Sequence, residues 1–327
     1  MQALLQPVTL NDIYEARRIV NRYLPQTPLA TSPILSKRLG FEAYVKCENL
    51  QPIGVFKVRG GINLISKLSE EEKRRGVITA STGNHGQSIA YAASLFGVKA
   101  IVAVPQKSNP NKVEAIRNFG AHIEFRGSDF DEARLWVEEE AKKKGYRYIH
   151  SANEPLLIAG VGTLYLEIME DLPDVEAILT PIGGGSGAAA ACVVAKSINP
   201  EVEIIGVQAE EAPSVYLSWK KKELVETKSA ETFADGLATR VPFKFTLGII
   251  NKMIDNIVLV SEREMKSAIL TLLETIHQLA EGAGAASTAA AFKLRKKLQG
   301  KKVALVLTGG NLTLQNLQTI LKETYAT

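Results

Sequence analysis

The sequence predicts an α/β protein with two open, twisted, mostly parallel sheets flanked by helices. Short apolar runs typical of buried strands alternate with helical periodicity between residues 76 and 150, and the alternation returns after residue 177. The chain has 327 residues, more than one hydrophobic core usually serves. We therefore expect two domains, or one large domain with a smaller one inserted.

The first alternating region is expected to form a small parallel sheet. Gly120 and Gly145 close two of its helical stretches, as glycines at helix C-termini do. The order of patterns is βαβαβαβ, which implies parallel strands with helices on the faces of the sheet. Strands are predicted at residues 77–80, 99–104, 123–125 and 146–149, and helices at 85–96, 110–119 and 129–144.

The C-terminal half repeats this pattern around a glycine-rich loop. The N-terminal region has a helix and a strand but no sheet of its own, so we expect its strand to join the C-terminal sheet. Residues 75–152 would then be a small inserted domain, and residues 1–74 and 153–327 the large domain. Helices are predicted at 10–20, 186–197, 262–279, 283–298 and from 314, and strands at 43–47, 177–180, 202–207 and 303–307.

Composition and charge exclude several classes of protein. Hydrophobic residues make up 46% of the chain and charged residues 23%, which is typical of a folded globular protein. The net charge is +4, but basic and acidic residues are mixed, as in residues 70–75 and 138–144. These runs predict solvated helix faces rather than a nucleic-acid surface, which needs charge of one sign concentrated together. No nucleic-acid partner is expected.

The cysteines and apolar runs bear on the compartment. Cys47 and Cys192 are the two cysteines, and no CxxC motif is present, which favours a reduced cytoplasm over a disulfide framework. The N-terminus lacks the pattern of a secretory signal. The apolar runs at 188–195 and 303–307 fall far short of the about 20 residues that a membrane-spanning helix needs. A cytoplasmic protein with no membrane partner is expected.

A glycine-rich loop, residues 183–187, lies between a predicted strand and an alanine-rich helix. Its backbone N–H groups and the helix N-terminus would favour a compact phosphate group. The sequence Gly-Gly-Gly-Ser-Gly is not a dinucleotide fingerprint, and it is not a P-loop because no Lys-Ser or Lys-Thr follows. The alternative is that these glycines only allow the strand and helix to pack closely.

Lys57 lies among apolar and aromatic residues rather than beside acidic partners, in the segment from Ile53 to Gly61. Burial lowers the pKa of a lysine and exposes a nucleophilic amine, which Schiff-base chemistry requires. Taken alone, Lys57 is better explained as a lysine whose side chain extends to the surface. The loop formed by residues 81–86 favours the Schiff-base interpretation of Lys57, because it lies between a predicted strand and helix, where backbone amides can hold a carboxylate. For His85 the alternative is a helix N-terminal residue that does not titrate.

These segments together resemble the fold-type II pyridoxal-phosphate enzymes, which share the fold of the tryptophan synthase β subunit. Within them the resemblance is to the threonine/serine dehydratase (threonine ammonia-lyase) and serine racemase group, and it covers essentially the whole chain. The motifs are Glu48-Asn49-Leu50-Gln51, Phe56-Lys57-Val58-Arg59-Gly60, Ser81-Thr82-Gly83-Asn84-His85-Gly86-Gln87, residues 183–187, Ala234-Asp235-Gly236, Glu281 and Thr308-Gly309-Gly310-Asn311.

The resemblance implies a role for each motif. Lys57 would hold pyridoxal 5'-phosphate as a Schiff base and remove the α-proton of the substrate, with Thr82 as a second catalytic residue. The other cofactor-binding residues would be Phe56, Asn84, Gly183, Gly184, Gly185, Ser186, Gly187, Gly236, Glu281 and Thr308. The substrate carboxylate would be bound by Ser81, Thr82, Gly83, Asn84 and His85.

Thr308 would face the pyridine nitrogen of the cofactor. A hydroxyl is too weak an acid to hold a proton on that nitrogen, whereas a carboxylate would make the ring a deep electron sink. Prompt loss of a β-substituent is then favoured. The expected activity is β-elimination from L-threonine, and from L-serine as well, giving 2-oxobutanoate or pyruvate plus ammonia.

Two departures from the group qualify these expectations. Serine racemases of the group carry serine at the position of Thr82, and many threonine dehydratases carry alanine. The acidic positions with which the racemases bind a divalent cation are Gln208 and Ser214 here, although Glu210 and Glu211 lie close by. A divalent cation is therefore a doubtful cofactor.

Alternative functions remain open. One is a serine racemase or a 3-hydroxyaspartate ammonia-lyase of the same fold, the latter calling for a basic residue such as Arg240. Another is a non-catalytic phosphate-binding or ligand-sensing protein. Only residues 312–327 follow Asn311, which leaves no room for the regulatory domain of biosynthetic threonine dehydratases, so a stand-alone catabolic enzyme is expected. The resemblance also implies a link to isoleucine biosynthesis, a small amino-acid substrate, and a homodimer or higher homo-oligomer.

Overall fold

The computed structural model describes residues 6–81, 83–108, 110–128 and 130–325 of the chain. Two compact units are present: residues 1–24 with 57–163, and residues 25–56 with 164–327. These bounds differ from the predicted division at residues 75 and 152. Helix packing explains the difference in the first unit. Helix α1 (Leu10–Val20) packs on α3 (Lys57–Ser66), and α3 packs on α5 (Asn84–Leu95), so all three helices belong to this unit.

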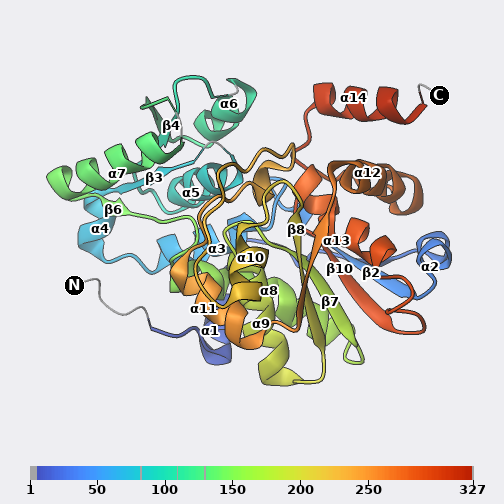
Figure 1. The fold of residues 1–327 in the computed structure, drawn as a ribbon. Helices are drawn as coiled ribbons and strands as arrows, with labels where there is room; N and C mark the ends of the chain where they lie inside the picture. The colour runs from blue at the N-terminus through green and yellow to red at the C-terminus, as the bar shows by residue number, and fades with distance from the viewer. Residues whose placement is uncertain (1–5, 82, 109, 129, 326–327) are drawn as a thin grey trace. The chain divides into compact units, whose positions relative to one another are not determined.

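The first unit contains a four-stranded parallel sheet in the order β5-β4-β3-β6. Helix α7 covers one face through apolar contacts with Ile78, Ile101 and Ala103. Helix α5 also packs on β3 and β4, and Figure 1 labels these elements. The strands are β3 (Val77–Ala80), β4 (Ala100–Val104), β5 (His122–Phe125) and β6 (Arg147–Tyr148), and the further helices are α4 (Glu70–Arg75), α6 (Pro110–Asn118) and α7 (Phe130–Lys144).

The second unit contains a six-stranded sheet in the order β1-β2-β10-β7-β8-β9. All its pairs are parallel except β1 with β2 at one edge. The predicted N-terminal strand therefore does join the C-terminal sheet, as β2 beside β10. The strands are β1 (Leu29–Thr31), β2 (Glu42–Cys47), β7 (Ala177–Pro181), β8 (Glu203–Ala209), β9 (Asn256–Val260) and β10 (Lys302–Leu307).

Helices cover both faces of this sheet. Helix α13 packs on β10, β7, β8 and β9, and α9 packs on β7 and β8. Side chains alternate between the faces of a strand, so Leu179 contacts the α13 side whereas its neighbour Thr180 bonds Tyr165 of α8 (Pro155–Asp171). The helices are α2 (Pro33–Leu39), α9 (Ser186–Ile198), α10 (Ser214–Lys221), α11 (Lys244–Met253), α12 (Glu262–Ile276), α13 (Gly282–Lys293) and α14 (Leu314–Tyr325), with short 3-10 turns at Glu48–Leu50 and Asp235–Leu237.

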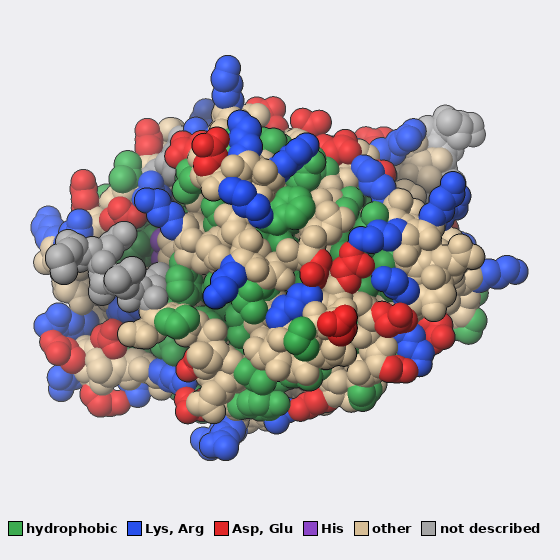
Figure 2. Space-filling model, turned by 60° about the horizontal axis from the view of Figure 1, so that its bottom comes forward, with side chains coloured by type: hydrophobic (Ala, Val, Ile, Leu, Met, Phe, Trp, Pro, Cys, Tyr) green, Lys and Arg blue, Asp and Glu red, His purple; other side chains and the backbone are tan. Residues whose placement is uncertain are grey.

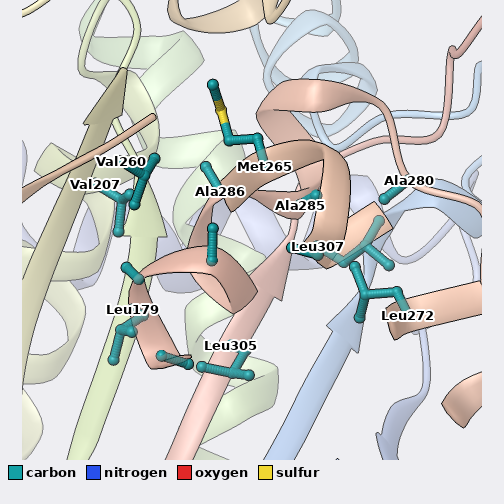
Figure 3. Close-up of a cluster of buried hydrophobic side chains, with 14 of the residues drawn as sticks. Leu179, Val207, Val260, Met265, Leu272, Ala280, Ala285, Ala286, Leu305 and Leu307 are labelled. Atoms are coloured by element: carbon teal, nitrogen blue, oxygen red, sulfur yellow. The ribbon is translucent and has the colours of Figure 1, made fainter. Parts of the chain in front are cut away.

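The main core of the second unit lies between the sheet and helices α12 and α13. Figure 3 shows Leu179, Leu305 and Leu307 of the sheet near Ala285 and Ala286 of α13, with Met265 of α12 above them and Leu272 of α12 at the right of the view. Alanine side chains let α13 approach the strands closely. At Gly284 the approach is closer still, because a Cβ there would overlap the Gly309 carbonyl oxygen.

The fold class predicted from the sequence is confirmed; several predicted elements differ at their ends, and some observed elements, among them α2, α8, α11 and β9, were not predicted. The helix predicted to reach residue 279 ends at Ile276, because His277 adopts the left-handed conformation with φ 58°. The helix predicted over 283–298 ends at Lys293. Asp129, the predicted start of a helix, lies outside the described residues. Helix α8 (Pro155–Asp171), which spans the boundary of the two units, was not predicted.

Charged side chains of both signs are mixed on the surface, as the sequence predicts. On the face shown in Figure 2, Lys and Arg side chains lie among Asp and Glu side chains. Within the described residues, no helix combines the length and the apolar character that crossing a bilayer requires.

Candidate active site

Lys57 is the first residue of α3 in the first unit. Its Nζ donates a hydrogen bond of 3.4 Å to the carbonyl oxygen of Ser151. Burial of the amine lowers the pKa of Lys57 to about 8 from its ordinary value of 10.5. A substantial fraction of the amine is therefore neutral near physiological pH, as a nucleophile must be.

Helix α3 is held against α5 at very short range. Gly61 packs on Ser88, so that a Cβ at residue 61 would overlap the Ser88 hydroxyl. The Ser88 Oγ in turn donates to the Lys57 carbonyl oxygen at 2.7 Å. Gly60 packs against Leu157 of α8, whose carbonyl oxygen would lie 2.8 Å from an added Cβ. The two glycines that follow Arg59 thus fix the start of α3, and with it the position of Lys57.

His85 lies in the first turn of α5 and is buried. Its Nε2 is 3.0 Å from the hydroxyl of Thr79, and that hydroxyl donates to the carbonyl oxygen of Ile149 at 2.8 Å. Burial, then the charge of Lys57, then His150, lower the pKa of His85 to about 3. The ring is therefore neutral at every physiological pH.

His150 orders the turn that presents the Ser151 carbonyl to Lys57. Its Nδ1 accepts hydrogen bonds from the backbone N–H groups of Ala152 and Asn153, both at 3.1 Å. Burial lowers the pKa of His150 to about 4. The imidazole is therefore neutral as well, and it keeps the lone pair that these two bonds need.

Of the predicted loop of residues 81–86, Ser81 and Gly83 precede α5, and Asn84, His85 and Gly86 form the start of that helix. The Ser81 hydroxyl accepts from the N–H groups of Gly83 and Gly86, at 3.3 and 2.9 Å. Gly83 is the N-cap residue of α5 and supplies no side chain to its first N–H groups. Asn84 begins the helix. Thr82, predicted as a catalytic and substrate-binding residue, lies outside the described residues.

The glycine loop, residues 183–187, leads into α9 in the second unit. Gly185 is the N-cap residue with φ 90°, a left-handed conformation that glycine adopts without strain. A Cβ at Gly183 would overlap the Gly236 carbonyl oxygen. The Gly184 carbonyl oxygen accepts from Thr246 at 2.8 Å. The loop is therefore held from two sides, and four of its five residues have no side chain to cover the backbone, which suits a phosphate at a helix N-terminus.

Tyr165 and Thr180 lie beneath the glycine loop. Their hydroxyls are 2.6 Å apart, and the Tyr165 oxygen is 3.4 Å from where a Cβ on Gly187 would lie. Burial raises the pKa of the Tyr165 phenol, so it stays protonated. Phe56 lies at the same place, with a ring carbon 3.7 Å from that Cβ position.

Three further predicted cofactor residues lie together in the second unit. The Thr308 carbonyl oxygen accepts from the N–H of Phe56 at 3.0 Å, and the Thr308 side chain is buried. Glu281 Oε1 lies 2.9 Å from where a Cβ on Gly309 would be, and 3.9 Å from the same position on Gly236. The structure thus brings Phe56, Gly236, Glu281 and Thr308 to the neighbourhood of one another.

Sequence reasoning missed several residues at these places. Thr79, His150 and Ser151 surround the amine of Lys57 and the ring of His85, and Tyr165 and Thr246 support the glycine loop. Thr79 and His150 both lie at or just after the carboxyl ends of predicted strands. Ligands of open α/β sheets bind at that edge, so this position could have indicated both residues. Tyr165 gave none, because it belongs to the unpredicted helix α8.

Gln208 and Ser214, the residues at the doubtful cation position, make internal hydrogen bonds. Gln208 Oε1 accepts from the N–H of Tyr216 at 2.9 Å, and Ser214 Oγ donates to the Thr239 carbonyl oxygen at 2.5 Å. In the part of the chain that the structure describes, no three His, Cys, Asp or Glu side chains gather as a metal site would require.

The residues present fit a phosphorylated aldehyde cofactor. A lysine with a lowered pKa can form the Schiff base, and a bare glycine loop at a helix N-terminus can bind the phosphate. An α/β fold with these two features defines an enzyme class that uses pyridoxal phosphate. The sequence profile of the pyridoxal-phosphate dependent enzymes matches residues 20–309, and the chain belongs to that family.

Known proteins similar to this chain carry more specific names. An L-threonine ammonia-lyase of Thermotoga maritima is 43% identical over 316 residues, which cover 97% of this chain and 79% of that protein. The solved structure of processed threonine deaminase isoform 2 from Solanum lycopersicum is 31% identical, covers 98% of this chain and 96% of its own, and superposes with a TM-score of 0.89. Maize serine racemase is 27% identical, covers 98% and 99%, and superposes with a TM-score of 0.92.

Proposed function

We propose that this protein is a pyridoxal-phosphate-dependent lyase that converts L-threonine, and L-serine as well, to 2-oxobutanoate or pyruvate plus ammonia. The observation that carries the proposal is the 43% identity to an L-threonine ammonia-lyase over 97% of this chain. The lowered pKa of Lys57 supports it, because β-elimination needs an amine that can both bond to an aldehyde and accept a proton.

Lys57 has two roles in the proposed reaction. Its neutral amine would hold the cofactor as a Schiff base and would be free again once the substrate is bound. The freed amine then accepts the α-proton of the substrate at Nζ. The Ser151 carbonyl, 3.4 Å from Nζ, orients the amine for this transfer.

The remaining predicted residues bind and orient. The bound cofactor would supply an electron sink for the α-carbon. Residues 183–187 would bind its phosphate, Asn84 its 3-hydroxyl and Thr308 its pyridine nitrogen, with Phe56, Gly236 and Glu281 around the ring. The substrate carboxylate would be held by the loop containing Ser81, Thr82, Gly83, Asn84 and His85, where the first N–H groups of α5 supply positive charge.

The overall reaction consumes no net water, because one molecule is released in the elimination and one is used to hydrolyse the imine. The α-proton passes to Lys57, and the β-hydroxyl takes up a proton, for which the bound cofactor's phosphate would be the donor, and leaves as water; the proton held on Lys57 replaces the one used, so no net proton is consumed. The released enamine tautomerises to an imine, which water hydrolyses to the keto acid and ammonia. The buried Thr308 hydroxyl favours this course, because it cannot keep the pyridine nitrogen protonated and a stored α-carbanion would be poorly stabilised.

A racemase is the second candidate, favoured by the superposition on maize serine racemase with a TM-score of 0.92. Racemisation needs a proton donor on the face of the substrate opposite Lys57, and the Thr82 hydroxyl is the proposed donor. Chiral chromatography of serine after incubation distinguishes the two functions. A 3-hydroxyaspartate ammonia-lyase would instead release oxaloacetate from that substrate.

Several finer points belong to the same proposal. Residues 1–74 and 153–327 would form the large domain that binds the cofactor, and residues 75–152 the small domain that carries the carboxylate loop. The enzyme would act in the cytoplasm as a homodimer or higher homo-oligomer. Its 2-oxobutanoate would arise from threonine catabolism or feed isoleucine biosynthesis.

The test is a keto-acid assay over L-threonine, L-serine and 3-hydroxyaspartate, with and without Mg²⁺. We expect 2-oxobutanoate from L-threonine, and loss of both activity and the visible absorbance of the bound cofactor in Lys57→Ala. Lys144→Ala, at an exposed lysine of the same unit, is the matched control and should retain both. Keto acid from none of the three substrates would overturn the proposal.

A further inference from the structure

The tautomer of His85 follows from a chain of two hydrogen bonds. The Thr79 hydroxyl has a single proton, and it donates that proton to the Ile149 carbonyl oxygen at 2.8 Å. The contact of 3.0 Å between this hydroxyl and Nε2 of His85 must then be donated by the ring. If Nε2 were unprotonated, the hydroxyl could satisfy only one of two acceptors. The ring therefore carries its proton on Nε2.

The other ring nitrogen, Nδ1, is left with a lone pair. This atom is buried and has no hydrogen-bond partner among the described residues. Lys57 and His150 are the titratable groups whose charges act on the ring, and His150 is itself neutral. A buried acceptor without a partner is costly. The ring is therefore arranged to accept a hydrogen bond from a ligand.

The chemistry of an amino-acid substrate limits which group can donate that bond. A carboxylate has only acceptors, so the ring of His85 cannot bind it through Nδ1. The amino group is used in bonding to the cofactor. A β-hydroxyl is the donor that remains.

The position of His85 is consistent with this partner. Ser88, one turn further along α5, bonds the Lys57 carbonyl at 2.7 Å, which places the first turns of α3 and α5 together. The charge of Lys57 also reaches the ring. A substrate whose α-proton goes to Lys57 carries its hydroxyl two bonds from that α-carbon, which brings it towards the neighbouring imidazole.

We propose that His85 is a specificity-determining residue, fixed by Thr79 as the neutral Nε2–H tautomer, whose Nδ1 accepts a hydrogen bond from the β-hydroxyl of the substrate. The proposal rests on the proposed function. The ring has no proton at Nδ1 to give to the leaving oxygen, so the bond recognises the hydroxyl rather than protonating it. Thr79 is the positioning residue that acts through the ring.

Nitrogen-15 NMR of the histidine-labelled holoenzyme tests the tautomer directly. The chain has four histidines, and the His85 signals are those missing from a His85→Asn variant. We expect the shifts of a neutral Nε2–H ring, unchanged between about pH 6 and about pH 9. Thr79→Val should move these shifts and Thr79→Ser should retain them. An Nδ1–H ring, or a ring that titrates in this range, would overturn the proposal.

A pair of variants separates the two ring nitrogens. The amide of His85→Gln can replace Nε2 and keep the bond to Thr79 but lacks the acceptor, whereas the amide oxygen of His85→Asn can replace Nδ1. The substrates are L-serine and β-chloro-L-alanine, which undergoes the same elimination without a hydroxyl. We expect His85→Gln to lower kcat/KM for L-serine about tenfold more than for β-chloro-L-alanine, and His85→Asn to affect both about equally.

Thermal unfolding and the visible absorbance of the cofactor establish that both variants are folded and loaded. Equal losses on the two substrates in His85→Gln would overturn this proposal while leaving the proposed function intact. A wild-type enzyme that converts β-chloro-L-alanine but none of the β-hydroxy amino acids would overturn the proposed function, and this proposal with it.

Discussion

Ser88 Oγ donates a hydrogen bond of 2.7 Å to the carbonyl oxygen of Lys57. This bond joins the second turn of α5 to the first residue of α3. It is possible only because Gly61, on the facing side of α3, has no side chain to displace the Ser88 hydroxyl. The position of the lysine therefore depends on close packing between two helices as well as on its own surroundings.

Gly61→Ala should separate these helices. The added methyl group overlaps the Ser88 hydroxyl and the Ser88 carbonyl oxygen would lie 2.7 Å from it, so we expect the free energy of unfolding to fall by about 1–3 kcal/mol. We also expect a raised pKa for Lys57, because water gains access to its amine. Urea denaturation and the pH dependence of cofactor binding measure the two effects.

Gly248→Ala is the matched control. Gly248 also lies within a helix, α11, but no atom lies within 4 Å of where its Cβ would be. Alanine has the higher helix propensity, so this substitution should raise the free energy of unfolding by about 0.5–1 kcal/mol. Equal effects at residues 61 and 248 would contradict the packing argument.

The sequence pattern predicted the strands more accurately than it predicted the helices. Strands β3, β4 and β7 are short apolar runs between turn residues, and their pattern is local. Helix α8 is apolar on nearly every side, so it shows no amphipathic period. Which sheet a strand joins depends on contacts between residues that are far apart in the sequence. Strand β2 was assigned to the correct sheet because the N-terminal region has no other predicted strand with which it could pair.

The residues of the candidate site also divide into those that the local sequence predicts and those that depend on the folded structure. Lys57 and the glycine loop stand out by composition, and their predicted neighbours Phe56 and Thr308 do lie together. Thr79 and His150 are ordinary residues at strand ends. The bond from Thr79 to Ile149 depends on the pairing of β3 with β6, and the other bonds of Thr79 and His150 depend on turns that the sequence pattern does not show.

Gly183→Ala should weaken cofactor retention. Its Cβ would overlap the Gly236 carbonyl oxygen, and backbone atoms at that distance cannot move aside cheaply, so the glycine loop must shift. We expect the dissociation constant for pyridoxal phosphate to rise by at least about tenfold, measured by fluorescence titration of the apoprotein. Gly248→Ala serves as the control for glycine replacement outside the loop, since Gly248 has no left-handed φ and no atom outside its own helix lies within 4 Å of its Cβ position. Unchanged affinity in Gly183→Ala would argue against the loop as the phosphate site.

Acid should destabilise the folded protein through His85. Its pKa is about 3 in the folded state, mainly because of burial, and near 6.5 when unfolded. Between these values the unfolded chain binds a proton that the folded chain does not, so the free energy of unfolding falls as pH falls. The steepest slope from one such group is about 1.4 kcal/mol per pH unit, and full stability is present above about pH 6.5.

His150 contributes with the same sign, since burial lowers its pKa to about 4. His85→Gln should therefore reduce the acid slope without abolishing it. Urea denaturation at several pH values between about 4.5 and 7.5 measures the slope. A slope unchanged by His85→Gln would show that the ring is not held neutral by the fold.

Lys46→Met should strongly destabilise the second unit. Lys46 is fully buried and its Nζ lies 2.6 Å from Glu167 and 2.7 Å from the Thr27 carbonyl oxygen. Removing the lysine leaves the Glu167 carboxylate buried without that cation, which costs about 3–5 kcal/mol in comparable pairs. The double variant Lys46→Met/Glu167→Gln should lose less than the sum of the single losses. Lys73→Met breaks the exposed pair with Glu70 and should change the free energy of unfolding by less than about 1 kcal/mol; additive losses in the buried pair would contradict the coupling.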